Sequence, residues 1–295
     1  MGADDSAIRH VTDTAIWVAH YRALESERPD ALFRDPLAKL LVGDRGKAIA
    51  ARMGKTSTYT QWSVVIRTVV IDRLLQNLVS GGVDTVINLG AGLDTRPYRL
   101  ALPTSLRWIE VDYPDTVERK NEMLANEEPS VSLERVGLDL SDRQARSSFL
   151  TRICADSKSS LILTEGVVPY LSPAEVGSLA DDLRQQASIQ YWIAEYYTPA
   201  VYPYLRSRRR KQIMKKAPFQ FFPENWFGFF RSHGWIQREI KYLPEEANKL
   251  NRGMQFPWWV RVLHALMSRK RKGRWLQSMG YVVYGKVEAY SDCQK

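Results

Sequence analysis

The sequence has little of what stabilises a secreted scaffold, holds a zinc ion or crosses a membrane. Its 295 residues include two cysteines, Cys154 and Cys293, which belong to no paired or metal-ligand motif. No segment reaches the roughly 18 consecutive apolar residues of a membrane span, and the N-terminus lacks the apolar core of a signal peptide. The composition therefore argues against a disulfide framework and predicts a cytoplasmic protein without a bound metal.

Acidic residues are too few to balance the basic ones. Aspartate and glutamate total 33 against 42 lysines and arginines, which gives a formal charge of +9. This excess favours an anionic partner, and a carboxylate substrate, an acidic carrier protein, nucleic acid or an anionic membrane would each satisfy it. Hydrophobic residues make up 44% of the chain, so we expect a folded chain with a sizeable core. No feature predicts an oligomeric state.

A short apolar run ends in a glycine-containing loop near residue 90. Residues 86–89 are typical of a buried parallel strand, and Gly90, Ala91 and Gly92 then permit a sharp turn and the close approach of a ligand. A second apolar run ends at Asp112, twenty residues after Gly92. In a doubly wound sheet such an acidic residue lies beside the glycine loop and accepts the ribose hydroxyls. The pair predicts a nucleoside-containing cofactor.

The loop lacks the third glycine of the dinucleotide fingerprint. That glycine brings the following helix close to the strand, and the helix N-terminus binds the pyrophosphate. Thr95 occupies the position here. We therefore favour S-adenosylmethionine, a nucleoside without phosphates, over a nicotinamide dinucleotide and the oxidoreductase chemistry that it would imply.

The chain divides into four segments by pattern. Residues 1–80 predict a helical cover over the ligand edge of a sheet, and residues 81–197 alternate strands with helices, which indicates a parallel sheet and a cofactor-binding core. We expect strands at residues 86–89, 108–112, 132–136, 161–165, 191–195, 236–242 and 281–287. Residues 198–256 carry a basic run (206–216) and an aromatic run (219–230), interpreted as a lid that selects the substrate or as a solvated helix and a packed cluster.

Residues 257–295 predict an amphipathic helix and a terminal strand that completes the core. Trp259, Val262, Leu263, Leu266 and Met267 form one apolar stripe, and four basic residues, 269–272, follow it. We interpret the segment as a core-packing helix with a basic C-terminal end, which the helix dipole favours. The alternative is a surface that contacts an anionic membrane or an acidic carrier.

Six blocks along the chain occur together, in this order, in one known family. They are residues 15, 21–26 and 33–38; residues 67–68 with 71–72; residues 89–100; residues 110–114; residues 139–140; and residues 164–166 with 170–171. On these blocks the chain resembles the leucine carboxyl methyltransferase family, including its bacterial polyketide O-methyltransferase branch. The resemblance implies an α/β fold, a class I methyltransferase Rossmann-like sheet of seven strands whose last strand is antiparallel, with an N-terminal helical cover and a lid insertion.

The resemblance also implies roles for individual residues, all of them in binding S-adenosylmethionine or placing its methyl group. Arg22 and Arg67 would pair with the cofactor carboxylate, and Gly90, Ala91 and Gly92 would let the backbone approach the cofactor. Asp112 would hold the ribose, and Asp139 and Leu140 would contact the adenine. Glu165 would lie near the methionine amine and the transferred methyl, and Tyr170 would be catalytic.

Each of these residues also has a structural alternative. Asp112 and Asp139 would cap helices, Arg22 and Arg67 would be ordinary pairing arginines, Glu165 would accept hydrogen bonds from loop amides, and Tyr170 would belong to the core.

The acceptor is expected to be a small-molecule acid. A carboxylate is ionised at neutral pH and needs no general base, and no histidine falls in the six blocks. Methylation of a hydroxyl would require a base. Methylation or binding of RNA is the rival that the basic and aromatic runs suggest, but residues 164–167 do not match the segment typical of base amino methylation. Cofactor binding without turnover is a further alternative.

Overall fold

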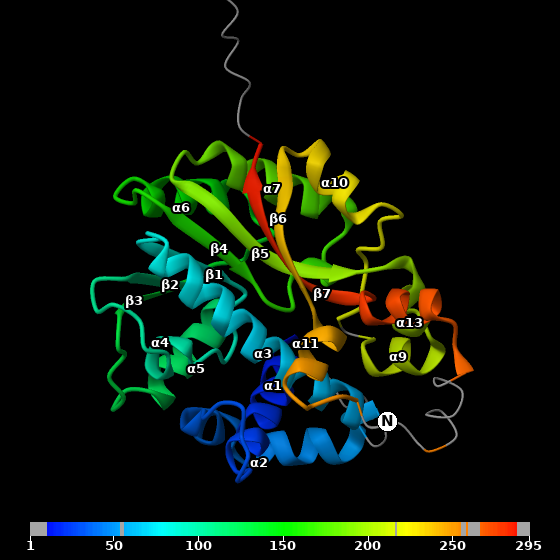
Figure 1. Ribbon diagram of the computed structural model, residues 1–295. Helices are drawn as coiled ribbons and strands as arrows, with labels where there is room; N and C mark the ends of the chain where they lie inside the picture. The colour runs from blue at the N-terminus through cyan, green and yellow to red at the C-terminus, as the bar shows by residue number, and fades with distance from the viewer. Residues whose placement is uncertain (1–10, 54–55, 216, 255–257, 259–265, 288–295) are drawn as a thin grey trace, which may run out of the picture.

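The computed structural model describes residues 11–53, 56–215, 217–254, 258 and 266–287. A seven-stranded sheet in the order β3-β2-β1-β4-β5-β7-β6 forms its centre (Figure 1). The strands are β1 Thr85–Leu89, β2 Arg107–Asp112, β3 Ser132–Gly137, β4 Ser160–Thr164, β5 Ile189–Tyr197, β6 Trp235–Tyr242 and β7 Met279–Lys286. Strands β1 to β5 pair in parallel, and β7 is antiparallel to both β5 and β6. The predicted seven-stranded class I sheet is confirmed.

Strand β1 lies inside the sheet, and all five of its residues are buried. Its apolar side chains pack on both faces of the sheet. Ile87 and Leu89 belong to the core under α6 (Arg143–Cys154) and α7 (Pro173–Gln185). Val86 belongs to the core under α3 (Thr56–Ser80). The chain proceeds outward from β1 to β3 on one side and returns at β4 on the other. In open α/β sheets this reversal places a crevice at the carboxyl ends of the strands, here β1 and β4.

The remaining helices are α1 Val11–Ser26, α2 Pro36–Met53, α4 Arg96–Arg99, α5 Pro114–Met123, α8 Tyr202–Leu205, α9 Arg208–Ile213, α10 Trp226–Ser232, α11 Leu243–Lys249 and α13 Arg269–Leu276. Helices α1 and α2 pack on each other at one end of the molecule, the lower end in Figure 1, far from α6 and α7. Helix α1 also contacts α3, which lies directly on the sheet through Ile66, Val70 and Leu74. None of the described helices is long and apolar enough to cross a membrane.

Most of the aromatic run belongs to the core. Phe221, Trp226 and Phe230 are buried in one cluster with Trp192 and Trp235. The packed-cluster interpretation therefore applies to these three side chains. Phe219 differs, because its ring stacks on Tyr170 with 4.9 Å between centroids.

The interpretation of residues 269–272 as the C-terminal end of a helix is wrong. They begin α13, where the Ser268 side chain caps the helix by accepting a hydrogen bond from the Arg271 amide. Four cations thus occupy the first turn, the end that the helix dipole disfavours for positive charge. Residues 259–265 of the predicted stripe lie outside the described residues, and Leu266 is 78% exposed instead of packed in the core.

Candidate active site

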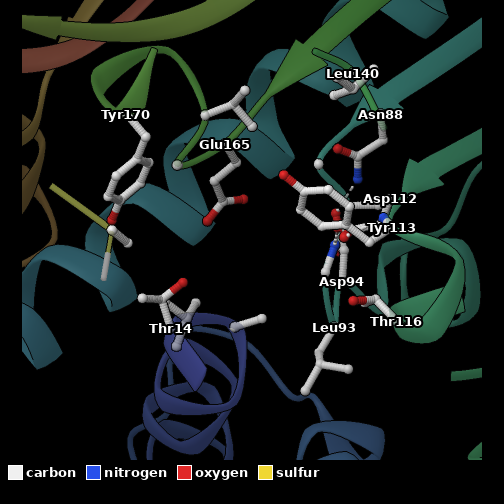
Figure 2. Close-up of a pocket in the computed structure, with 18 of the residues that line it drawn as sticks. Thr14, Asn88, Leu93, Asp94, Asp112, Tyr113, Thr116, Leu140, Glu165 and Tyr170 are labelled. Atoms are coloured by element: carbon white, nitrogen blue, oxygen red, sulfur yellow. Dashed lines mark hydrogen bonds between the residues drawn. The ribbon is translucent and has the colours of Figure 1, made fainter. Parts of the chain in front are cut away.

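A cavity of about 360 Å³ opens at the carboxyl ends of β1, β2 and β4, against α1 (Figure 2). This volume is in the range of small-molecule and cofactor sites. The residues that line it include every one proposed from the sequence: Arg22, Arg67, Gly90, Ala91, Gly92, Asp112, Asp139, Leu140, Glu165 and Tyr170. The structure therefore brings together side chains from six separate blocks of the chain.

The glycine loop forms a wall free of side chains. Gly90 has φ +69° and Gly92 has φ +48°, a region that other residues rarely adopt. A Cβ added at Gly90 would lie 2.5 Å from a methyl group of Val167. The amides of Gly90 and Ala91 donate to the Val111 carbonyl over 2.8 and 3.0 Å, which ties the loop to β2. The loop fits the backbone cradle that a nucleoside needs.

The Asp112 carboxylate is fixed beside this loop by two backbone amides. Gly92 N donates to Oδ2 over 2.7 Å, and Tyr113 N donates to Oδ1 over 2.8 Å. Asp139 similarly accepts from Ser141 N over 2.9 Å. Neither acid caps a helix, because the N-cap of α5 is Tyr113 and that of α6 is Asp142; both bind loop amides and line the cavity. Because an ionised carboxylate accepts about four hydrogen bonds, each keeps capacity for a ligand.

Glu165 lies at the other side of the cavity, held by two guanidinium groups. Arg67 Nε is 2.8 Å from Oε1, an ion pair without the direction of a hydrogen bond, and Arg96 Nη1 donates to Oε2 over 2.8 Å. Burial alone would raise the pKa of Glu165, but the charges of Arg96 and Arg67 outweigh burial and hold the pKa below its usual value. Glu165 is therefore an ionised group paired with two arginines and does not have the predicted role of binding loop amides.

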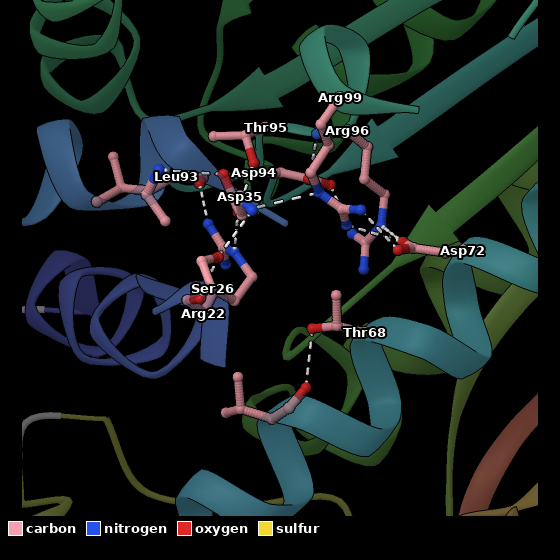
Figure 3. Close-up of polar contacts among 12 residues, drawn as sticks. Arg22, Ser26, Asp35, Thr68, Asp72, Leu93, Asp94, Thr95, Arg96 and Arg99 are labelled. Atoms are coloured by element: carbon pink, nitrogen blue, oxygen red, sulfur yellow. Dashed lines mark hydrogen bonds and ion pairs between the residues drawn. The ribbon is translucent and has the colours of Figure 1, made fainter. Parts of the chain in front are cut away.

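The guanidinium of Arg22 is hydrogen-bonded mainly to other groups of the protein (Figure 3). Its Nε donates to Asp35 over 2.8 Å and its Nη2 to the Leu93 carbonyl over 2.5 Å. Thr95 donates to the same Asp35 oxygen over 2.7 Å. These bonds fasten the glycine loop to α1 and to the start of α2. Arg22 does line the cavity, but its clearest role in this structure is to hold that wall in place.

Arg96 is a residue that our reading of the sequence missed. It is 2% exposed and contacts three carboxylates: Asp72 and Asp94 over 2.7 Å and Glu165 over 2.8 Å. Figure 3 shows it beside Arg99, which shares Asp72. The sequence does carry a signal for Arg96: Asp94 and Arg96 stand two residues apart in the glycine motif, where the expected cofactor has no phosphate group to bind an arginine.

Glu195, at the carboxyl end of β5, was also missed. Its Oε1 accepts from the amides of Gly166 and Val167, so Glu195 supplies the loop contacts proposed for Glu165. Its Oε2 is buried without a hydrogen-bond partner. Burial raises the pKa of Glu195 to about 7. It is the last residue of the strand predicted at residues 191–195, and an acid at the end of a predicted strand is the same signal that found Asp112.

The fold and the lining of this site are those of the class I methyltransferases, the class that takes S-adenosylmethionine as its cofactor. A profile of the family described as leucine carboxyl methyltransferase matches residues 15–184, and the chain belongs to that family. The resemblance inferred from the six sequence blocks is thereby confirmed.

Two bacterial relatives are provisionally named S-adenosyl-L-methionine-dependent methyltransferases. A protein of Streptomyces coelicolor is 35% identical over 185 residues, which is 59% of this chain and 65% of that protein. A protein of Parafrankia is 31% identical over 244 residues, 77% of each chain. The first match thus spans slightly less than two thirds of the relative. A solved structure, provisionally named a methyltransferase of Thermobifida fusca, has a TM-score of 0.57 at 14% identity, covers 96% of this chain and 97% of its own, and shares the fold.

Proposed function

We propose that the protein is an S-adenosylmethionine-dependent O-methyltransferase that forms a methyl ester on the carboxylate of a small natural-product or polyketide-like acid. One observation carries the proposal: Glu165, the acid nearest the expected methyl group, is ionised and paired on both oxygens by guanidinium groups. It is a poor proton acceptor, so the site suits a nucleophile that arrives already ionised. A carboxylate is such a nucleophile at neutral pH.

When bound, S-adenosylmethionine would supply a methyl group activated by its sulfonium charge, and its transfer to a carboxylate oxygen would leave S-adenosylhomocysteine and require no proton transfer. The chain's own contribution is binding and alignment: Asp112 for the ribose, Asp139 and Leu140 for the adenine, and Arg67 for the amino-acid end. Such alignment can supply about 7–11 kcal/mol.

Methylation of a hydroxyl is the second candidate, and Glu195 is the observation that favours it. A buried carboxyl group with a pKa of about 7 and an unpartnered oxygen has the properties of a general base. Under this candidate Glu195 would take the proton of an alcohol or phenol. The two candidates differ in the bond that holds the new methyl group.

The test is to incubate the protein with methyl-labelled S-adenosylmethionine and separate panels of organic acids, phenols, alcohols and RNA. We expect label in the acids, released by mild base as methanol. Base-stable label in a phenol or alcohol would establish the second candidate, and label in RNA would overturn both.

A further inference from the structure

A second cavity of about 80 Å³ adjoins the cofactor cavity and shares part of its wall. Thr14, Arg67, Gly166 and Tyr170 line both. Figure 2 shows Tyr170 near Glu165 and Thr14, on the side of the cavity away from Asp112. The second cavity is therefore next to the end of the site where the methyl group is expected.

Arg210, from α9, reaches this cavity with part of its charge uncompensated. Its Nη1 donates to the Tyr204 hydroxyl over 3.1 Å, and its guanidinium lies 5.7 Å from the centre of the Phe219 ring. Its Nε is buried with no hydrogen-bond partner. Arg210 also makes no ion pair within the part of the chain that the structure describes. A buried cationic donor without an acceptor is costly, so Arg210 favours a hydrogen-bond acceptor at this wall, and an anionic one most of all.

Neighbouring arginines do not share this environment. Arg206 stacks on the Phe222 ring at 4.2 Å, and Arg208 is exposed and lines neither cavity. Arg206, Arg208 and Arg210 all belong to the basic run 206–216, and of these three the structure turns Arg210 toward the site.

The other walls of the cavity define the kind of ligand. Burial raises the pKa values of Tyr170 and Tyr197, so both keep their hydroxyl protons and can donate. Trp17, Met214 and Phe219 supply apolar surface. Two arginines, Arg67 and Arg210, line the cavity against one acid, Glu195, and Arg67 is already paired with Glu165. With the phenolic donors and apolar walls, this lining suits a carboxylate attached to a small aromatic or aliphatic body.

We propose that this second cavity is the methyl-acceptor site and that Arg210 binds the carboxylate of a short monocarboxylic acid. The inference rests on the proposed function, because it assigns a place to the acceptor of that reaction. It adds a binding residue, and it favours an acid with a small body because this cavity is much smaller than the cofactor cavity, about 80 against 360 Å³.

Binding is tested without turnover, on the full chain saturated with S-adenosylhomocysteine. Benzoate and phenylacetate are titrated by calorimetry into the wild type, R210M and R208M, and the corresponding amides serve as uncharged probes. We expect the acids to bind the wild type and R208M equally and R210M about ten-fold or more weakly, because charge-assisted hydrogen bonds contribute about 1.5–3 kcal/mol. The amides should bind all three proteins alike.

Unchanged acid binding in R210M, equal binding of acids and amides by the wild type, or no acid binding would overturn the inference. A separate labelling assay distinguishes its failure from failure of the proposed function. If acid binding depends on Arg210 but no acid accepts label, the function is wrong and the site stands. If acids accept label with an unchanged KM in R210M, the site is wrong and the function stands.

Discussion

At the scale of single residues, the buried acids around the cavity fall into two kinds. Burial raises the pKa of Asp94, but the adjacent Arg96 charge outweighs it and the net pKa is lowered, as at Glu165. Glu195 has only backbone amides on one oxygen and nothing on the other, so burial dominates. The site thus keeps one set of acids ionised and one acid that titrates near neutrality.

The pH dependence of the reaction should show whether Glu195 lies beside a carboxylate or a hydroxyl acceptor. Its charged and titratable neighbours are Arg67 on α3, Glu165 after β4, Tyr170, Tyr197 on β5 and Tyr281 on β7. Because its pKa is raised, Glu195 is uncharged below about pH 7 and gains a negative charge above it. That charge would repel a carboxylate acceptor, so we expect kcat/KM for an acid to fall as pH rises through 7. The E195Q variant should lack this fall.

The opposite sign would contradict the carboxylate. If kcat/KM rises through pH 7 and E195Q abolishes the activity, Glu195 acts as a base and the acceptor is a hydroxyl. The profile is measured from pH 5.5 to 8.5 with saturating cofactor.

Arg96 should be a large single contribution to stability. R96M leaves Asp72, Asp94 and Glu165 buried without their shared cation, and we expect the free energy of unfolding to fall by about 3–5 kcal/mol. R152M removes an arginine from the exposed pair with Glu134 and should cost less than about 1 kcal/mol. Urea unfolding compares them, and equal losses in the two variants would refute the central role of Arg96.

The positions of the predicted residues could be inferred from the ends of the strands, but their hydrogen-bond and ion-pair partners could not. Asp112 and Glu165 could be located because each follows a buried apolar run, and parallel strands end at one edge. The pairs Arg22–Asp35, Thr95–Asp35 and Arg96–Glu165 join residues 13, 60 and 69 positions apart. Sequence spacing carries no information on such contacts. The ligand-binding roles of the site residues stay predictions.

At the scale of elements, the loop after β1 depends on having a glycine, without a side chain, at position 90. G90A would force a Cβ against Val167 at a positive φ and narrow the cavity, so we expect S-adenosylmethionine to bind about ten-fold or more weakly. G82A is the matched control, because Gly82 also has a positive φ, at +102°, but has open space around it and lies at the opposite end of β1. Equal cofactor affinity in the two variants would show that the loop is not the cradle.

Strands were predicted more accurately than helix ends. All seven strands were located, and the buried ones, such as β1 and β4, are short apolar runs bounded by turn residues. The basic run at 269–272 was misplaced, because a cluster of cations does not show which end of a helix it occupies. Arg210 could not be singled out from its basic neighbours, because orientation on a short helix is decided by what packs against it.

At the scale of the whole molecule, one topological feature explains why these elements form a site. Strands β1 and β4 are adjacent but connect in opposite directions across the sheet, and their carboxyl ends leave a crevice that α1 covers. Backbone amides hold Asp112 and Asp139, arginines hold Asp94 and Glu165, and Arg210 lies in the adjoining cavity. The proposed roles thus assign the ribose and adenine to the end with Asp112 and Asp139 and the acceptor to the end with Arg210.

Calorimetric titration with S-adenosylmethionine tests the central claim most directly. We expect one cofactor molecule to bind per wild-type chain, and binding to D112A to be about 10- to 100-fold weaker through loss of hydrogen bonds to the ribose. D115A, which removes an exposed acid three residues away, should bind like the wild type. Absence of binding to the wild type, or undiminished binding to a folded D112A, would contradict the account.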